Sequence, residues 1–311
     1  MARRKLLNEE ELQIVNKATY ITTDEEGFKL FYEDCQLRNL RPHTFKFYRE
    51  GLKPFHGKPI VTMTERDIKN MILEMQQKGL KVATINAKLR AYRSFFNFLY
   101  KNKHIKQNPI ANVKLMKGRK EIVQTFSKEQ LEKLFSLCDF KTFVGVRDYT
   151  IMTLFLDTGI RLNELINIEL EDVKEEKVII RETKTYFQRE VPITKKCSEQ
   201  LEMYIKIRGR ANTEKLFINQ DGNELKKRSV QSRFESYSKQ SGITDVRISA
   251  HTFRHTFAKF FIQQGGNAFH LQQILGHTSL EITKIYVNLF ATDVADAHTQ
   301  FSPLNSINKR K

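Results

Sequence analysis

The segment from His251 to Tyr286 contains residue types that could bind a phosphate and attack it. His251 and Arg254 are three residues apart, so on a helix their side chains share one face. His277 directly follows Gly276, which is typical of the end of a helix, and Tyr286 lies nine residues beyond His277. Cationic and proton-bearing groups close to a phenol indicate an anion site with its own nucleophile.

Phosphoryl transfer needs positive groups around the phosphoryl oxygens, an in-line nucleophile and a proton donor for the leaving oxygen. Arg161 and Arg254 could each bind non-bridging oxygens through a guanidinium fork, and His277 could donate a further hydrogen bond. Lys184 could protonate the leaving alkoxide from a hairpin, and Tyr286 could attack the phosphorus. Together these side chains would fill each role that the reaction requires.

Some of these residues also have a purely structural explanation. Arg161 and Glu164 have the i,i+3 spacing of an ion pair on a helix surface, which stabilises a protein only weakly. Tyr286 could be a buried phenol that is hydrogen-bonded to the backbone, as single tyrosines commonly are. Lys195 and Lys196 are alternatives to Lys184, although they follow the second predicted strand instead of lying between the strands.

A metal site is the main chemical alternative for the histidines. His251 and His255 are four residues apart on a predicted helix, and His277 could be a third ligand. The acidic residue of the His-Glu-x-x-His pattern is missing, however, and a structural role is enough to explain His255. The chain also has no glycine-rich phosphate loop followed by Lys-Ser or Lys-Thr. We therefore expect no metal and no cofactor.

The positive charge of the chain is concentrated in its first part. The net charge of the 311 residues is +17. Residues 1–120 contain 25 Lys and Arg against 12 Asp and Glu, a net charge of +13, which leaves +4 for residues 121–311. A basic N-terminal part beside a nearly neutral C-terminal part predicts that the protein binds nucleic acid by neutralising phosphates.

Composition also indicates where the protein works. The three cysteines, Cys35, Cys138 and Cys197, are widely spaced, which favours reduced thiols over a disulfide framework or a zinc ribbon. The sequence contains no apolar run of the roughly 20 residues that a membrane span needs, and its charged N-terminus does not resemble a signal peptide. We expect a cytoplasmic protein without a membrane partner.

Apolar periodicity and capping residues predict a helical N-terminal domain. Helices are expected from Thr22 or Thr23, from Pro42, after Thr64, and from Thr84 to about Asn102. In the last of these, Ile85, Leu89, Tyr92, Phe96 and Leu99 form an inner stripe with a period of 3.6 residues, so we interpret the aromatic side chains as core. Residues 1–21 are a charged lead-in, 22–112 the helical domain and 113–125 a basic linker.

A second domain is expected over residues 126–290, followed by a tail over 291–311. Predicted helices begin at the capping box of Ser127 and run over 144–157, from 161, over 199–207, over 230–240, and through the segment after His251. Strands are expected at 178–180 and 190–193, joined as a hairpin, with a further short strand at 216–218. The fold class is therefore mainly α (α+β), with a small antiparallel sheet.

Four motifs in this second domain resemble the tyrosine recombinase, or phage integrase, family. They are Thr-Gly-Ile-Arg-Leu-Asn-Glu-Leu (158–165), His-Thr-Phe-Arg-His (251–255), Leu-Gly-His-Thr-Ser-Leu (275–280) and Tyr286. Thr183-Lys184 before the strand is similar to the hairpin lysine of the family, although the flanking glycines of the family are missing. Residues 91–99 with Asn108-Pro109 resemble its SAM-like core-binding domain. Each motif is weak alone, but together they are specific.

The resemblance implies a fold and a mechanism. Two domains would form a C-shaped clamp on double-stranded DNA, and Tyr286 would form a 3′-phosphotyrosyl bond and release a 5′-hydroxyl. Arg161, Arg254 and His277 would stabilise the transition state, and Lys184 would be the general acid. One ester replaces another, so neither ATP nor a metal would be needed.

Two further residues have implied supporting roles. His251 would assist proton movement near the nucleophile, and Glu164 would hold the site in shape. The reaction would serve integration and excision, transposition, or resolution of DNA.

The resemblance also implies a homotetramer on paired recombination sites. Residues 291–305 would then dock on a neighbouring copy, as an amphipathic helix lies in a groove. Two other functions remain open from the sequence. One is a non-catalytic architectural DNA-binding protein of the same fold, and the other is a type IB-like topoisomerase that acts without paired sites.

Overall fold

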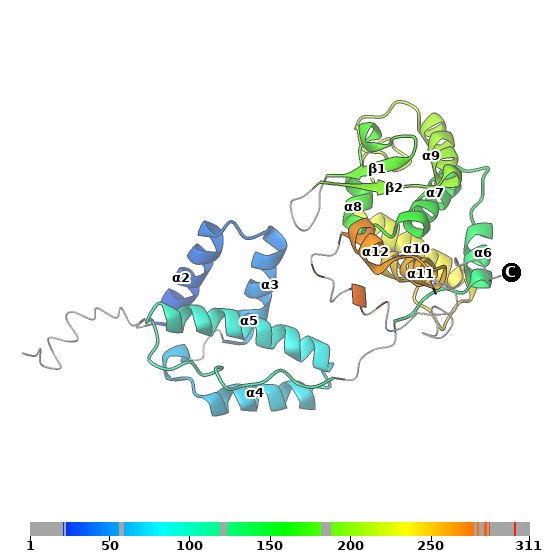
Figure 1. Ribbon diagram of the computed structural model, residues 1–311. Coiled ribbons are helices and arrows are strands. Elements are labelled where there is room, and N and C mark those ends of the chain that lie inside the picture. The colour runs from blue at the N-terminus through cyan, green and yellow to red at the C-terminus, as the bar shows by residue number, and fades with distance from the viewer. Residues whose placement is uncertain are drawn as a thin grey trace, which may run out of the picture. The chain divides into compact units, whose positions relative to one another are not determined.

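The computed structural model in Figure 1 describes residues 21, 23–55, 59–118, 123–181, 188–276, 279, 283, 284, 286 and 302. These residues are mostly helical and include a two-stranded antiparallel sheet, which confirms the predicted mainly α (α+β) class. The chain divides into two compact units, Met1–Glu121 and Ile122–Lys311. Within the described residues, none of the helices combines the length and the apolar character that crossing a bilayer requires.

The first unit is a helical bundle around one long central helix. Its helices are α2 (Asp24–Leu37), α3 (Pro42–Leu52), α4 (Glu65–Gln77) and α5 (Val82–Lys101), with 3-10 turns η1 (Lys53–Phe55) and η2 (Ile60–Thr62). Helix α5 contacts α2, α3 and α4, as Figure 1 shows. It begins two residues before the predicted Thr84. Helix α4 begins with a capping box between Thr64 and Asp67, which satisfies backbone N–H groups at its start.

The aromatic stripe of α5 forms the core of the first unit. Ile85, Leu89, Tyr92, Phe96 and Leu99 are each at most 1% exposed, which confirms the interpretation of the stripe as core. Among the described helices, α2 covers this core with aromatic rings such as Phe28 and Phe31, whereas α4 contributes Ile68, Met71 and Met75. The core therefore uses the apolar face of α5, and the polar residues of the helix remain outside.

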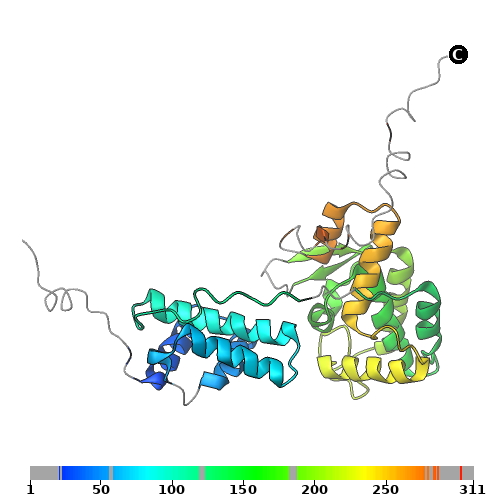
Figure 2. The same ribbon diagram turned by 90° about the horizontal axis from the view of Figure 1, so that it is seen from below.

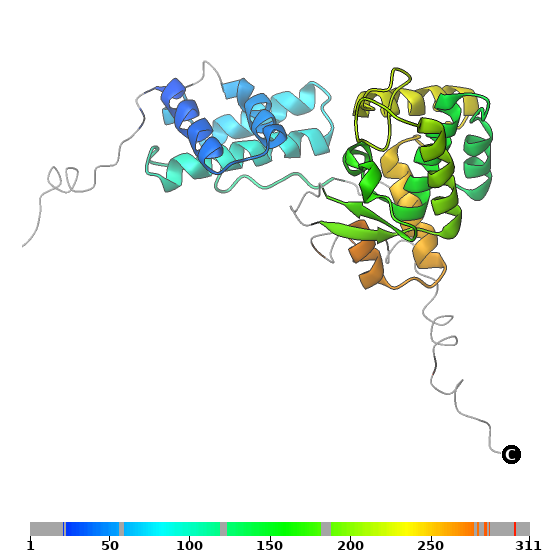
Figure 3. The ribbon, with the colours of Figure 1, turned by 90° about the horizontal axis from the view of Figure 1, so that it is seen from above.

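The second unit has seven helices among its described residues and a small sheet. They are α6 (Lys128–Ser136), α7 (Phe143–Thr158), α8 (Leu162–Asn167), α9 (Lys195–Arg208), α10 (Lys227–Ser241), α11 (Ala250–Gln263) and α12 (Ala268–Leu275), with η3 (Leu170–Asp172), β1 (Lys177–Ile180) and β2 (Arg189–Pro192). Strands β1 and β2 pair antiparallel, with Val178 opposite Val191. Figures 2 and 3 show this sheet beside α12, which β2 contacts.

The expected strand at 216–218 is wrong. Lys215 and Ile218 form only isolated bridges, with Glu169 and Glu224 respectively. Leu216 and Phe217 are completely buried, so their apolar character reflects packing into the core and not membership of a sheet. A short apolar run does not distinguish these two situations.

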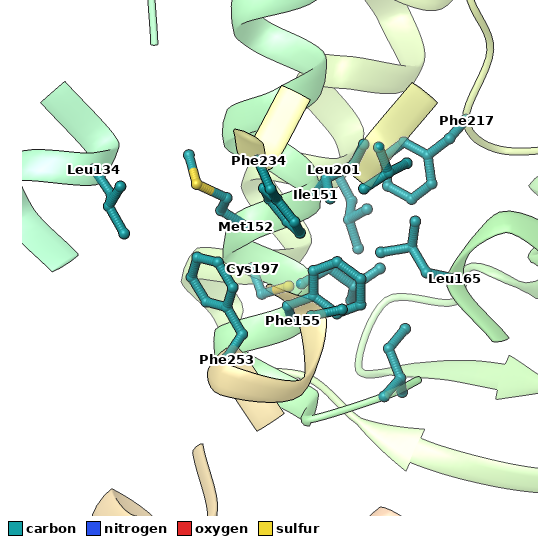
Figure 4. Packing of buried hydrophobic residues seen from close by; sticks show 14 of the residues in the cluster. Leu134, Ile151, Met152, Phe155, Leu165, Cys197, Leu201, Phe217, Phe234 and Phe253 are labelled. Atoms are coloured by element: carbon teal, nitrogen blue, oxygen red, sulfur yellow. The ribbon is translucent and has the colours of Figure 1, made fainter. Parts of the chain in front are cut away.

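Helix α7 is the centre of the second unit. It is buried along most of its length, as its nearly continuous apolar sequence predicted, and it packs against both α9 and α11. Figure 4 shows Phe155 of α7, Phe234 of α10 and Phe253 of α11 packed together, with ring centroids 5.7–6.2 Å apart. These rings fix the rotation of α11, and therefore the position of Arg254, the residue after Phe253.

Helix α7 ends at Gly159, whose backbone is left-handed with a φ of 62°. A Cβ atom on Gly159 would lie 2.6 Å from side-chain atoms of both Leu275 and Phe257. Two physical requirements therefore favour glycine here: the left-handed turn and the close approach of α11 and α12.

We predict that Gly159→Ala destabilises the second unit by about 2–4 kcal/mol, because left-handed strain of about 1–2 kcal/mol is combined with steric overlap. Gly242→Ala is a matched control, since Gly242 also ends a helix with a φ of 64° but a Cβ there would meet nothing within 4 Å. This control should lose only the strain contribution. Urea unfolding of both variants measures the difference, and equal losses would contradict the packing argument.

Candidate active site

The turn after α7 places Arg161 and Glu164 at the start of α8. Arg161 is the N-cap residue, and its backbone N–H donates to Glu164 Oε2 over 2.8 Å. Its Nη1 donates to Glu164 Oε1 over 2.9 Å. Glu164 thus caps the helix and orients the guanidinium with the same carboxylate. Because the side chain of Glu164 is only 2% exposed, the alternative of a surface ion pair is wrong.

Arg254 lies on α11 and is almost completely buried. It is 4% exposed, and its Nη1 donates to the carbonyl of Gly159 over 2.7 Å while Nη2 donates to the carbonyl of Leu275 over 2.8 Å. Burial, followed by the neighbouring positive charge of Arg161, lowers the pKa of Arg254 to about 10. The guanidinium therefore remains positive at neutral pH, although water that would normally solvate its charge has been removed.

Arg189 is a third arginine of this cluster, and it was not among the residues predicted for the site. From β2, its Nη1 and Nη2 donate to the two carboxylate oxygens of Glu164 over 3.0 and 2.8 Å. Burial alone would raise the pKa of Glu164, but the hydrogen bonds and charge of Arg189, together with Arg161, hold it below its usual value. The sequence did contain a signal for Arg189. Side chains of a strand point alternately to its two faces, so Arg189 lies on the same face as the buried Val191, and Glu190 lies on the opposite, exposed face.

The end of α12 accepts hydrogen bonds from all three arginines. Arg189 Nε donates to the carbonyl of Ile274 over 3.1 Å. Arg161 donates to the carbonyls of Leu275 and Gly276, each over 3.4 Å, and shares the Leu275 carbonyl with Arg254. The last carbonyls of a helix have no partner within it, and they carry partial negative charge that attracts cations. This helix end therefore draws the guanidiniums together.

Gly276 lets the arginines approach this closely. Its backbone is left-handed, with a φ of 63°, as predicted for a residue that ends a helix. A Cβ atom at this position would lie 2.8 Å from Arg189 Nη1. A side chain here would therefore have to displace the guanidinium that holds Glu164.

His251 and His255 are four residues apart on α11, so they share one face of this helix, and Tyr286 contacts that face through His255. His255 Nδ1 lies 2.8 Å from the hydroxyl oxygen of Tyr286. Tyr286 is 5% exposed; burial raises its pKa, and the positive charge of Arg254 opposes this rise. Desolvation, followed by the charges of Arg254 and Arg161, lowers the pKa of His251, so its ring is neutral at pH 7.

The structure thus brings five of the predicted site residues into one region. They are Arg161, Glu164, His251, Arg254 and Tyr286, which are linked by the hydrogen bonds or by the electrostatic effects described above. Lys184 and His277 lie outside the described residues. Among the described part of the chain, no group of three His, Cys, Asp or Glu side chains could hold a metal ion.

Comparison with known proteins agrees with this fold. Residues 124–292 match the model of the phage integrase family, and residues 28–103 match the N-terminal SAM-like domain of phage integrases. The tyrosine recombinase XerC of Thermodesulfovibrio yellowstonii is 30% identical over 310 residues, which cover 94% of this chain and 99% of that protein. XerC of Oceanobacillus iheyensis is 28% identical over 295 residues, which cover 90% and 96%.

A solved structure shows the same fold at lower sequence identity. The Tn1549 transposon integrase in complex with transposon right end DNA has a TM-score of 0.75 at 22% identity, covering 90% of this chain and 99% of that chain. The class defined by this fold and by the family models is the tyrosine-type site-specific DNA recombinases. The chain belongs to the phage integrase family.

We predict that Glu164→Gln lowers the free energy of unfolding by about 3 kcal/mol, because Arg161 and Arg189 would then face each other without the buried carboxylate between them. Glu190→Gln, next to Arg189 on β2, is the control. Glu190 forms an exposed pair with Lys177, which contributes about 0–1 kcal/mol. Urea unfolding measures both variants, and equal effects would show that the buried carboxylate has no special role.

The effect of Glu164→Gln should also depend on pH in a defined direction. The pKa of Glu164 in the folded protein is lower than the usual glutamate value. Its stabilising contribution is therefore fully present above the usual value of about 4.3 and is lost as the pH falls through the lowered pKa. The wild type and the glutamine variant should accordingly converge in stability only in strong acid, which unfolding curves at several pH values would measure.

Proposed function

We propose that the protein cuts and rejoins strands of double-stranded DNA through a 3′-phosphotyrosyl intermediate, with Tyr286 as the nucleophile. The observation that carries this proposal is the Leu275 carbonyl shared by Arg161 and Arg254, because it holds two guanidiniums side by side. The positive charges of both arginines act to lower the pKa of the buried Tyr286, against the effect of burial. Two guanidinium groups next to a phenol could bind the non-bridging oxygens of a phosphodiester while the phenolic oxygen attacks its phosphorus.

The proposed reaction exchanges one phosphate ester for another. The oxygen of Tyr286 forms a bond to phosphorus and its proton passes to water with the help of the neutral His251, while the bond from phosphorus to the 5′-oxygen breaks. Lys184 donates a proton to the departing 5′-oxygen, and Arg161, Arg254 and His277 bind the phosphoryl oxygens. A 5′-hydroxyl from the partner strand then reverses these steps and releases Tyr286. Because the number of ester bonds is conserved, the exchange needs no ATP.

Strand exchange requires more than one copy of the site. We propose that the protein acts as a homotetramer on paired recombination sites, in which residues 291–305 of the tail dock on a neighbouring copy. The net charge of +13 on residues 1–120 supports binding of the DNA backbone by the first unit. We propose integration and excision, transposition, or resolution of DNA as the purpose; the relatives named tyrosine recombinase and the transposon integrase support recombination and transposition.

We predict that the wild-type protein forms a covalent adduct with nicked duplexes in which cleavage releases a short strand that diffuses away. A library with a randomised region supplies the unknown target, and the trapped DNA is identified by sequencing. Tyr286→Phe should form no adduct, because it lacks the attacking oxygen, and should still bind the selected DNA. Tyr149→Phe is a matched control, since Tyr149 contacts Phe135 and Phe140 through its ring, and it should react normally.

The same substrates separate the alternative functions. DNA binding without an adduct from the wild type would indicate an architectural protein. Relaxation of a supercoiled plasmid that lacks the selected sequence would indicate a topoisomerase. An adduct that persists in Tyr286→Phe would refute the assignment of the nucleophile.

A further inference from the structure

The hydroxyl of Tyr286 has a well-defined partner in the ring of His255. His255 Nδ1 lies 2.8 Å from the hydroxyl oxygen, and the ring centroids are 5.6 Å apart with an interplanar angle of 48°. This distance is typical of a strong hydrogen bond between a hydroxyl and an imidazole nitrogen. The contact joins α11 to a residue 31 positions later in the chain, so it fixes the phenol to the helix that also carries Arg254.

The surroundings of His255 keep its ring neutral, so that Nδ1 is able to accept a hydrogen bond. Burial, followed by the proximity of His251 and Arg254, lowers the pKa of His255 to about 4, so the imidazole is neutral at physiological pH. A neutral imidazole has one nitrogen that donates and one that accepts. With the proton on Nε2, Nδ1 accepts the hydroxyl hydrogen of Tyr286. The lone pairs of the phenolic oxygen then point away from His255.

We propose that His255 is a positioning residue for the nucleophile, and that its Nδ1 holds the hydroxyl of Tyr286 beside the phosphate site formed by Arg161 and Arg254. The inference rests on the proposed function, because it assumes that Tyr286 attacks the phosphate. It adds a residue that acts only through Tyr286. Loss of this acceptor would remove one restraint on the position of the phenolic oxygen, and even a displacement of about 1 Å can reduce a reaction rate roughly 100-fold.

The surrounding contacts argue against a merely space-filling role for His255. Its neighbour Phe253 fills the core through three aromatic contacts, and the buried Thr256 accepts a hydrogen bond from the backbone of Phe126. These two residues connect α11 to the rest of the unit. His255 instead directs a ring nitrogen at the hydroxyl of Tyr286. Its hydrogen-bonding atom is therefore the property to test.

Three substitutions separate the hydrogen bond from the size of the side chain. His255→Asn keeps a polar atom close to the position of Nδ1, whereas His255→Gln places its amide near the position of Nε2. His255→Leu has no polar atom. We expect His255→Leu and His255→Gln to reduce the single-turnover rate of adduct formation about 10- to 100-fold on saturating DNA, and His255→Asn to recover most of the loss. DNA affinity and melting temperature should stay close to those of the wild type.

A modified substrate tests whether the slow reaction of the His255 variants arises from the attacking oxygen or from the leaving group. Replacing the 5′-bridging oxygen by sulfur gives a leaving group that needs no proton. Lys184→Ala should be slow on ordinary DNA and should recover on this sulfur substrate, because its proposed role is to protonate the leaving oxygen. His255→Leu and His255→Gln should stay slow on both substrates.

The possible results have distinct meanings. An unchanged or faster rate in His255→Leu or His255→Gln would overturn the proposal, as would an equally slow His255→Asn. Recovery of the slow variants on the sulfur substrate would also overturn it, because the defect would then lie on the leaving-group side. Absence of an adduct from the wild type on both substrates would instead refute the proposed function itself. Because Asn and Gln are both polar amides, their comparison remains informative even if the leucine variant fails to fold.

Discussion

The mutual repulsion of three guanidiniums is the constraint that shapes the second unit. Arg161, Arg189 and Arg254 all bind the end of α12, and Arg254 is nearly dehydrated. Like charges in such a place would separate unless negative charge compensated them. Glu164 supplies a full charge between two of the arginines, and the carbonyls at the end of α12 supply partial charge.

This compensation leaves the site short of negative charge. The pKa of Arg254 falls to about 10 because removal of water and the charge of Arg161 both disfavour its protonated form. A phosphate that enters between these arginines would provide the missing negative charge. Binding of the phosphate would be more favourable the more it reduced the repulsion between the guanidiniums. The guanidinium N–H donors are already in position before the phosphate binds. The site is thus prepared for an anion by the same contacts that hold α8, α11 and α12 together.

The sequence predicted those parts of the site that lie in local motifs. Arg161 with Glu164, and His251 with Arg254, have helical spacing, and the order of the motifs in the sequence indicated the family. Gly276 was recognised as a helix end because its backbone requirement is local. The same holds for most helices, whose capping residues and apolar periods lie within a few positions of each other.

Long-range contacts were harder to predict. Arg189 binds a carboxylate 25 positions earlier, and His255 meets a hydroxyl 31 positions later, so neither contact has a local period. Residues 216–218 are apolar, as in a buried strand, but they lie in the core and form no continuous hydrogen-bonded pairing with another strand. In each case the outcome depends on which elements pack together, and a single sequence does not contain this information explicitly.

Much of the framework around the arginines consists of main-chain atoms. Four of the groups that accept their hydrogen bonds are the carbonyls of Gly159, Ile274, Leu275 and Gly276. A substitution changes a side chain and leaves the main-chain carbonyl in place. These acceptors are therefore retained when neighbouring side chains change, provided that the backbone conformation is unchanged. The two left-handed glycines protect that path. An architecture of this kind can diverge widely in sequence while its charged centre stays the same.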